Sequence, residues 1–313
     1  MKPLRIVFFG TPDFASASLR SLLDADEQVV AVVTQPDRKQ GRNQKLLPPP
    51  VKVLAESRGI PVIQPASVRT SDFLTWFQEQ NADLAVVVAY GKIIPPQLVA
   101  LPPHGFVNVH ASLLPKYRGA SPIQSALIHG ETESGVTIMK MDEGLDTGPM
   151  YLTRRVALDE STTAAELHDE LAVVGGEALV EMLCELRTGT VTLTDQEDEH
   201  ATYAPLLKKA DGKVDWTLDA KQVVDGVRGR YPWPGSFCFH EGRRIRLFPM
   251  EGWEPGAENG MPGEVLEVTS NRIRVQTGSG TVSLGMCQLE GKKALPPGEF
   301  VNGYALAEGD HLD

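Results

Sequence analysis

The sequence has few cysteines, and they form no pattern that would build a site. Cys184, Cys238 and Cys287 lie far apart in the 313-residue chain, without a CxxC pair or a matching histidine spacing. Disulfide frameworks and structural zinc sites both need closely grouped ligands. Neither is expected, and we interpret the thiols as reduced packing residues.

Long hydrophobic runs are also missing. No apolar stretch approaches the roughly 20 residues that a membrane helix requires, and the first residues turn polar too early for a secretory signal. We therefore expect a cytoplasmic protein without membrane association. We also expect a monomer. The 42% of hydrophobic residues can still build real cores, and the length favours two domains.

The glycine-rich loops that bind nucleotide phosphates are absent. Neither G-x-G-x-x-G nor G-x-x-x-x-G-K-[ST] follows the first apolar run, which ends at Gly10. Such loops hold pyrophosphate or triphosphate on backbone N–H groups at a helix N-terminus. Their absence disfavours a nicotinamide dehydrogenase and a nucleoside-triphosphate enzyme.

Positive charge is in deficit overall. Lys and Arg number 30 against 41 Asp and Glu, a net charge of −11, which argues against nucleic-acid binding over the whole surface. Two segments depart from this balance. Five cations face one carboxylate in 37–52, and nine face five in 206–250, so each segment has a local charge of +4.

Short apolar runs alternate with helical segments in the first half of the chain. This alternation predicts an α/β domain with a doubly wound, Rossmann-like parallel sheet. A long helix over 163–187, stopped by Gly189, would close the domain. The expected strands span 4–10, 29–33, 60–63, 82–89, 105–109, 134–141 and 150–158.

The pattern changes after the long helix. Residues 190–205 are polar and acidic, as in a linker between a catalytic domain over 1–189 and a second domain over 206–313. In the second domain a short helix over 219–230 precedes short strands separated by Gly and Asn turns. These strands predict a smaller C-terminal OB-like β-barrel domain. They span 236–240, 243–249, 263–268, 272–276 and 281–284.

Two polar side chains mark the end of a predicted strand. Asn108 and His110 are separated by one residue, so they project from the same face. Ligands of doubly wound sheets bind beyond the carboxyl ends of strands. Asp146 lies in a later glycine-bracketed loop that also follows a strand. If the strand ends are neighbours, Asp146 can reach His110, fix its tautomer and favour its charged form. Taken singly, the histidine would more often be structural and the aspartate a turn residue.

These residues resemble the formyltransferases that use 10-formyltetrahydrofolate. The resemblance rests on Asn108–Pro115, Tyr117–Ala120 and Met141–Gly148, and it implies catalytic roles for the Asn, His and Asp named above. Other segments resemble the members that act on methionyl initiator tRNA, so the similarity spans nearly the whole chain. These segments are Gly10–Phe14, Thr34–Arg38, Gly41–Arg42, Val88–Gly91 and Pro232–Pro234.

The resemblance implies transfer of a formyl group from 10-formyltetrahydrofolate to the α-amino group of methionyl initiator tRNA. The product would be N-formylmethionyl-tRNA for translation initiation, and no metal is required. Asn108 and His110 would stabilise the oxyanion while Asp146 sustains the imidazolium. The matching folate-binding segment comprises Ser112, Leu113, Leu114 and Pro115. Ala111 stands where the family often has Gly, a small change that leaves the chemistry in place.

The tRNA would be held by the two basic segments. Arg42 is the principal expected contact in the first, with phosphate neutralisation by Arg38, Lys39 and Lys45. Lys39-Gln40 replaces the Pro-Ala common in the family, which adds a charge, so the resemblance does not fix the exact RNA contacts of this loop. The alternative for this loop is a solvated surface. In the C-terminal domain, the strands around 243–246 would follow the RNA backbone.

Three other functions compete with this one. A sugar-amine or purine-precursor formyltransferase would share the catalytic residues but would need neither basic segment. A non-catalytic RNA-binding protein on a transferase scaffold is disfavoured because all three polar residues are intact. A nicotinamide dehydrogenase is disfavoured by the missing glycine loop.

Overall fold

A computed structural model describes residues 3–40, 44–256 and 260–313 of the chain. The chain forms two compact units. The first comprises 1–119, 135–156 and 168–203, and the second comprises 120–134, 157–167 and 204–313. The second unit thus includes two segments that lie within the predicted catalytic domain over 1–189.

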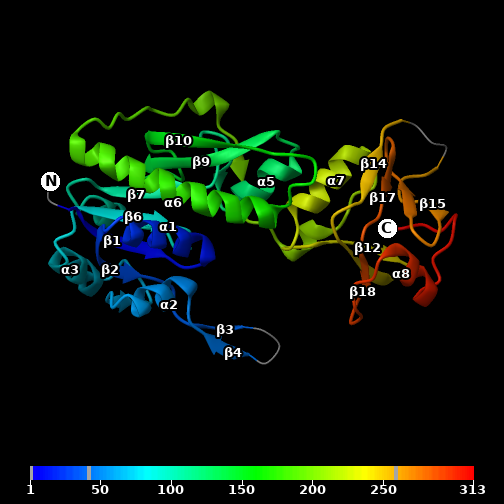
Figure 1. Cartoon of the computed structure of the whole chain (residues 1–313), viewed down its shortest axis with the longest axis horizontal. Coiled ribbons are helices and arrows are strands. Elements are labelled where there is room, and N and C mark those ends of the chain that lie inside the picture. Colours follow the sequence, from blue (N-terminus) through cyan, green and yellow to red (C-terminus); the bar gives the residue numbers. More distant parts are fainter. Residues whose placement is uncertain (1–2, 41–43, 257–259) are drawn as a thin grey trace. The chain divides into compact units, whose positions relative to one another are not determined.

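A seven-stranded sheet forms the centre of the first unit (Figure 1). The strand order is β10-β9-β7-β6-β1-β2-β5. The five strands from β7 to β5 are parallel, which confirms the doubly wound prediction for this part of the sheet. The strands are β1 (Arg5–Gly10), β2 (Gln28–Val33), β5 (Val62–Ile63), β6 (Leu84–Val88), β7 (Phe106–His110), β9 (Glu133–Lys140) and β10 (Met150–Ala157).

Strand β9 departs from the parallel prediction because it runs antiparallel to β7. A parallel return would need a crossover helix on the sheet. The helix available between them, α5 (Pro122–Ile128), instead belongs to the second unit, where it contacts α7 (Ala220–Gly229). The local sequence pattern does not indicate the direction of β9.

Helices cover both faces of the sheet. Against one face, a Cβ on Gly175 of α6 would lie 2.9 Å from Val109, and one on Gly176 would lie 2.3 Å from Ser21 of α1, so glycine permits this close approach. The other face carries an aromatic cluster in which Phe9 contacts Phe77 of α3. These helices are α1 (Asp13–Asp24), α2 (Pro50–Ser57), α3 (Ser71–Glu79), α4 (Pro96–Val99) and α6 (Ala164–Thr188).

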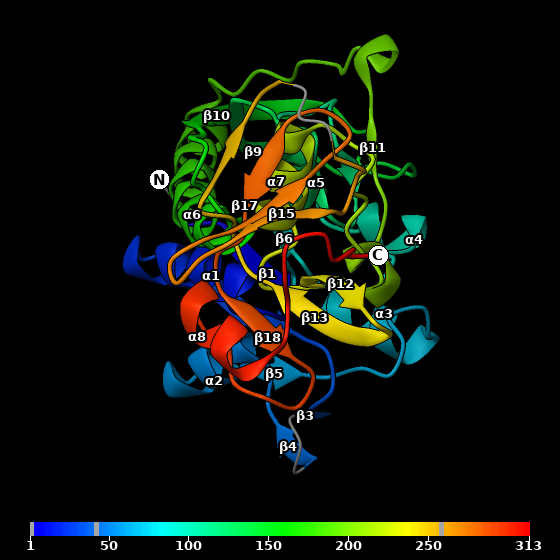
Figure 2. The same ribbon diagram turned by 90° about the vertical axis from the view of Figure 1, so that its right-hand side faces the viewer.

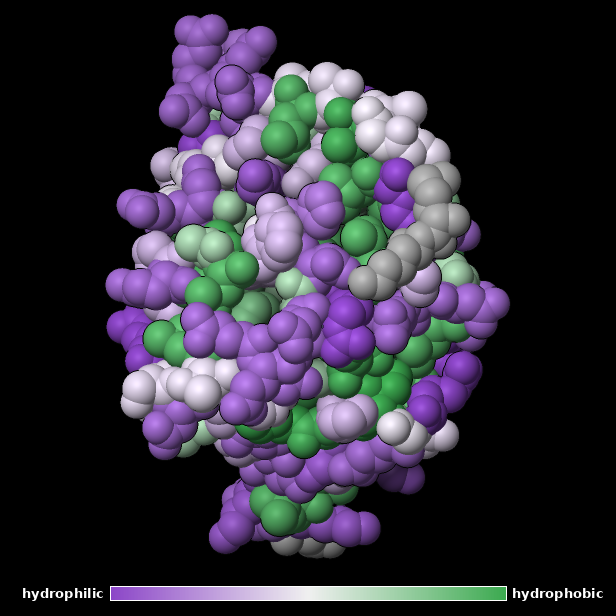
Figure 3. Space-filling view, turned by 90° about the vertical axis from the view of Figure 1, so that its left-hand side faces the viewer, coloured by the Kyte–Doolittle hydropathy of each residue, from purple (hydrophilic) through white to green (hydrophobic). Residues whose placement is uncertain are grey.

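The predicted basic loop contains a hairpin that the sequence pattern did not indicate. Strands β3 (Arg38–Gln40) and β4 (Lys45–Leu47) pair antiparallel. In Figure 3, hydrophobic atoms lie among hydrophilic ones at the lower end of the molecule, where this hairpin is found. Its exposed hydrophobic residues are Leu46 and Leu47. None of the helices in the described parts of the chain is long and apolar enough to cross a membrane.

The second unit is built mainly from antiparallel strands around a common core (Figure 2). One sheet has the order β12-β13-β18 and the other β14-β17-β16-β15. The OB-like class is thereby confirmed, and the predicted helix over 219–230 is α7. Strands β14 and β18, of three residues each, were not predicted. The elements are β12 (Ser236–His240), β13 (Arg243–Leu247), β14 (Gly252–Glu254), β15 (Val265–Val268), β16 (Ile273–Gln276), β17 (Thr281–Ser283), β18 (Cys287–Leu289) and α8 (Pro297–Gly303).

Candidate active site

Asn108, His110 and Asp146 meet at the carboxyl end of β7. The first two lie on β7, and the loop that follows its neighbour β9 carries the aspartate. Asn108 Nδ2 donates to Asp146 Oδ1 at 3.4 Å, and His110 Nδ1 lies 3.8 Å from the same oxygen. The register pairs Lys140, the last residue of β9, with Val107, so the loop after β9 starts near the amino end of β7 and turns back to bring Asp146 to Asn108 and His110.

The tautomer of His110 is determined by a backbone carbonyl. His110 Nε2 lies 3.0 Å from the carbonyl oxygen of Tyr117, which can only accept, so Nε2 carries a proton. The prediction that Asp146 fixes the tautomer is wrong, because Nδ1 lies beyond hydrogen-bond distance of the carboxylate. The imidazole is only 6% exposed, so its two nitrogens have few other partners.

Asp146 is held in an unusual backbone conformation. Its φ is +56°, in the left-handed region that residues with a Cβ rarely adopt. One carboxylate oxygen, Oδ2, accepts the Gly119 N–H at 2.8 Å. The other, Oδ1, therefore faces Asn108 and His110.

Gln196 ties the Asp146 loop to a buried arginine. Its Nε2 donates to the carbonyl oxygens of Asp146 at 2.8 Å and Gly148 at 2.7 Å. Its Oε1 accepts from Arg118 Nε at 3.0 Å and Nη2 at 2.8 Å. Carbonyls only accept and guanidinium groups only donate, so the amide orientation is unambiguous. Arg118, 2% exposed, also pairs with Asp198 at 2.6 Å.

Sequence reasoning did not identify Gln196. It lies in the polar stretch interpreted as a linker, where an isolated glutamine carries no local signal. Its partner Arg118 entered only through the family resemblance of Tyr117–Ala120. The structure places 190–203 within the first unit.

The segment Ser112–Pro115 is fastened to β9. Thr137 Oγ1 donates to the Ser112 carbonyl at 2.7 Å and accepts the Leu114 N–H at 3.1 Å. Ser112 and Leu114 are buried, whereas Leu113 and Pro115 are partly exposed. Any ligand of this segment can thus contact the two partly exposed side chains and the backbone.

A separate groove of about 1100 Å³ lies at the ends of the first strands. It is lined by segments that follow β1, β2 and β6, and by residues of β3, β4 and α2. Thr11 Oγ1 and Gln35 Nε2 both donate to the Tyr90 carbonyl, at 3.1 Å and 3.2 Å, and so link these three strand ends. The sequence pattern of these strand ends did not predict the groove. Asn108, His110 and Asp146 do not line it.

Three of the four residues predicted to contact tRNA are exposed in the basic hairpin. Arg38, Lys39 and Lys45 are exposed, and Arg42 lies outside the described residues. The fifth cation, Lys52, is committed to Asp37 at 3.0 Å. Hydrogen bonds from Gln64 and then Lys52 lower the pKa of the Asp37 carboxyl. These contacts of Asp37 lie at the base of the hairpin.

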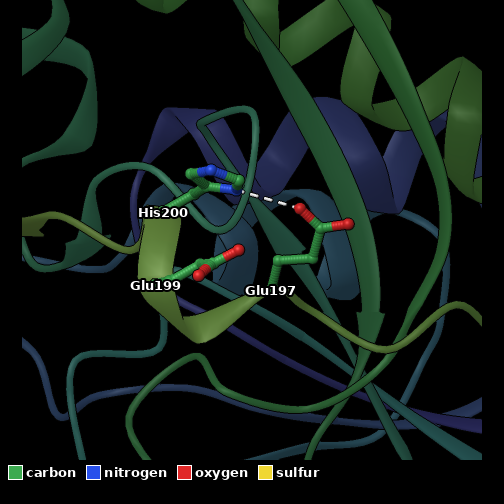
Figure 4. Close-up of side chains that lie close together, drawn as sticks. All are labelled: Glu197, Glu199 and His200. Atoms are coloured by element: carbon green, nitrogen blue, oxygen red, sulfur yellow. Dashed lines mark hydrogen bonds and ion pairs between the residues drawn. The ribbon is translucent and has the colours of Figure 1, made fainter.

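One group of residues has atoms spaced as metal ligands. Glu197, Glu199 and His200 place a ligand atom each within 4.8 Å of one another, and His200 Nδ1 lies 2.9 Å from Glu197 (Figure 4). All three are exposed, and Asp198 in the same turn is bound by Arg118. Exposed acidic groups often lie this close without an ion, so we assign no metal to the cluster.

The comparisons with known proteins define the class. A family model described as "Formyl transferase" matches residues 4–183, and one described as "Formyl transferase, C-terminal domain" matches 206–305. The chain therefore belongs to the formyl transferase family, and the resemblance inferred from its motifs is confirmed.

Among individual relatives, the chain is similar to proteins named methionyl-tRNA formyltransferase. It is 47% identical to that of Geobacter sulfurreducens over 100% of this chain and 98% of the relative. It is 48% identical to that of Desulfotalea psychrophila over 97% of this chain and 94% of the relative. The similarity thus extends over both units.

Solved structures share the fold at lower identity. HypX from Aquifex aeolicus in complex with tetrahydrofolic acid is 20% identical, with a TM-score of 0.61 over 99% of this chain and 51% of that one. WlaRD, a sugar 3N-formyl transferase, is 18% identical, with a TM-score of 0.63 over 94% and 100%. These matches bear on the fold alone.

Proposed function

We propose that this protein transfers the formyl group of 10-formyltetrahydrofolate to the α-amino group of methionyl initiator tRNA in the cytoplasm. Its family and its full-length relatives named methionyl-tRNA formyltransferase support the reaction. The observation that carries the chemistry is the convergence of Asn108, His110 and Asp146 at the end of β7.

The reaction needs an oxyanion stabiliser. The neutral amine attacks the formyl carbon, and the carbonyl oxygen becomes an oxyanion in the tetrahedral intermediate. Asn108 has two amide hydrogens and Asp146 accepts one, so the other can be donated to this oxygen. Cleavage of the bond from carbon to N10 then leaves the formyl group on methionine.

After the attack the amine nitrogen is an ammonium, and the reaction must move a proton from it to the departing folate nitrogen. His110 Nε2 is occupied by the Tyr117 carbonyl, so Nδ1 is the atom suited to exchange protons. Asp146, 3.8 Å away, would stabilise the imidazolium whenever Nδ1 is protonated. The same proton could instead be transferred through Asp146 or through an ordered water.

The donor and acceptor would use separate surfaces. Ser112–Pro115 would flank the folate, and the Met141–Gly148 loop would line the pterin pocket. The groove at the first strand ends has room for an acceptor end, beside the exposed cations of the β3–β4 hairpin. Residues 206–313 would form the second tRNA-binding domain.

The test is formylation of a defined acceptor. The protein is incubated with 10-formyltetrahydrofolate and methionyl initiator tRNA, and N-formylmethionine is measured after hydrolysis of the ester. His110→Ala serves as the inactive control. Parallel reactions offer an amino sugar nucleotide and glycinamide ribonucleotide. Faster formylation of either small amine than of the tRNA would overturn the proposed acceptor.

A further inference from the structure

Thr202 lies in the polar stretch after α6, and its three polar groups all contact one turn of the chain. Its Oγ1 accepts the Tyr117 N–H at 2.9 Å, and its carbonyl oxygen accepts the Arg118 N–H at 2.9 Å. Its own N–H donates to the Pro115 carbonyl at 3.3 Å. A single residue of the predicted linker therefore holds three residues of this turn.

Tyr117 needs this support because its backbone is strained. Its φ is +62°, in the left-handed region that a residue with a Cβ rarely adopts. Thr202 accepts the N–H groups of the two peptide units that meet at the Tyr117 Cα. Since each peptide unit is planar and turns only about that Cα, the two hydrogen bonds together restrain the φ and ψ of Tyr117.

The second of these peptide units also supplies the hydrogen-bond acceptor of His110. The Tyr117 carbonyl oxygen lies 3.0 Å from His110 Nε2, and the Arg118 N–H of the same unit donates to Thr202. In a trans peptide the N–H and C=O groups point in opposite directions within one plane. The hydrogen bond to Thr202 therefore orients the carbonyl oxygen toward the imidazole.

Two acceptors lie beside the two nitrogens of the His110 ring. The Tyr117 carbonyl is next to Nε2, and the Asp146 carboxylate is 3.8 Å from Nδ1. A neutral imidazole has one N–H, so the better-placed acceptor determines which nitrogen carries it. While the carbonyl is held, the proton stays on Nε2 and the Nδ1 lone pair is available. If the carbonyl turns away, the carboxylate can attract the proton to Nδ1, and Nδ1 can no longer accept another.

We propose that Thr202 is a positioning residue for His110, an inference that rests on the proposed function, in which Nδ1 exchanges the proton. Thr202 orients the Tyr117 carbonyl, which keeps the ring proton on Nε2 and leaves Nδ1 able to accept one. Thr202 thus acts through Tyr117 rather than on the substrate. The stretch over 190–205 is then required for turnover and is more than a connection between domains.

Substitution of Thr202 separates this role from simple anchoring of the stretch. Thr202→Val keeps the shape and the backbone hydrogen bonds but removes the oxygen that accepts the Tyr117 N–H, and Thr202→Ser restores that oxygen. Thr194→Val is the matched control, because Thr194 of the same stretch pairs with Met150 through its backbone N–H and carbonyl. Melting temperatures verify that each variant folds.

The kinetic test compares kcat with KM. We expect Thr202→Val to lower kcat for formylation of methionyl-tRNA about 10-fold, with KM for the tRNA and for 10-formyltetrahydrofolate changed less than about 2-fold. Thr202→Ser should recover most of kcat, and Thr194→Val should match wild type. Equal losses of kcat in the two valine variants, or wild-type kcat in folded Thr202→Val, would overturn the inference. So would a Thr202→Ser protein as slow as Thr202→Val.

The spectroscopic test observes the tautomer itself. Histidine is labelled for ¹⁵N NMR, and the His110 signals are identified by their absence from His110→Ala. The neutral ring should carry its proton on Nε2 in wild type and Thr202→Ser, whereas Thr202→Val should gain a population protonated on Nδ1. A wild-type ring with its proton on Nδ1 would overturn the inference without any Thr202 variant. An unchanged tautomer in a Thr202→Val protein of reduced kcat would also overturn it.

The two measurements distinguish this inference from the proposed function. If wild type formylates methionyl-tRNA while Thr202→Val keeps both the kcat and the tautomer of wild type, the role of Thr202 is wrong and the function stands. If wild type does not formylate the tRNA, the proposed function is wrong. The tautomers of wild type and Thr202→Val then still decide whether Thr202 positions the His110 ring.

Discussion

Replacement of Gln196 by alanine tests whether the Asp146 loop must be held for catalysis. The change removes two hydrogen bonds to the carbonyls of Asp146 and Gly148, and two from Arg118. At about 1 kcal/mol for each neutral bond and about 1.5 to 3 kcal/mol for the charged contact, the loss would reach roughly 4 kcal/mol. Arg118 keeps Asp198, so we expect a decrease in unfolding free energy of about 2 to 3 kcal/mol.

The effect on turnover follows from the backbone of Asp146. A left-handed φ costs an L-residue roughly 1 to 2 kcal/mol, and Gln196 contributes two of the contacts that maintain it. Without them the carboxylate would move relative to Asn108 and His110, and a displacement of about 1 Å can cost 10²-fold in rate. We therefore expect kcat to fall about 10- to 100-fold, with KM for folate and tRNA nearly unchanged.

A second variant separates position from stability. Gln196→Glu can still accept from Arg118 but cannot donate to the two carbonyls, so it should lose kcat while keeping more stability than Gln196→Ala. Glu199→Ala, on the neighbouring exposed turn, is the control and should change neither. Unfolding is followed by urea titration and turnover by N-formylmethionine release. Wild-type kcat in a folded Gln196→Ala protein would refute this reasoning.

Further predictions concern the site, the hairpin and stability. Alanine at Asn108, His110 or Asp146 should lower kcat about 10²-fold or more without loss of the urea transition; near-normal turnover of His110→Ala would exclude the mechanism. Arg42→Ala should lower kcat/KM for methionyl-tRNA at constant folate affinity, and an unchanged tRNA response would favour a merely solvated loop. Hydrogen bonds from Ser161 and Thr162 lower the pKa of Asp159 to about 2. The ionised carboxylate therefore stabilises the folded state at pH values above its ordinary pKa of 3.8, and this contribution is lost as pH falls through about 2. The stability difference between wild type and Asp159→Asn should therefore narrow over that interval in urea titrations, and a difference independent of pH would contradict it. Gly135→Ala should destabilise the folded protein by about 1 to 3 kcal/mol, because its Cβ would lie 2.1 Å from the Arg154 carbonyl oxygen. An unchanged melting temperature would contradict this prediction, because it would mean that β10 shifts without cost.

Much of the fold and part of the site could be predicted from local sequence. The buried parallel strands β1 and β6 are continuous apolar runs, and α7 begins where Asp219 and Gln222 form a reciprocal cap. The spacing of Asn108 and His110 on one strand face also follows from a period of two residues. These features depend on residues that are close in sequence.

Other features depend on contacts between distant parts of the chain. The antiparallel direction of β9, the Tyr117 carbonyl on His110 and the groove at the first strand ends have no local pattern. Gln196 shows the reason most clearly, because it lies 50 residues from Asp146 in sequence and 2.8 Å from its carbonyl oxygen. Periodicity and motifs by themselves determined the main strands of both units, the polar pair and the family of this protein. Only the tertiary structure decided which donor meets which acceptor, because a hydrogen bond requires a short distance and a direction that only the folded chain supplies.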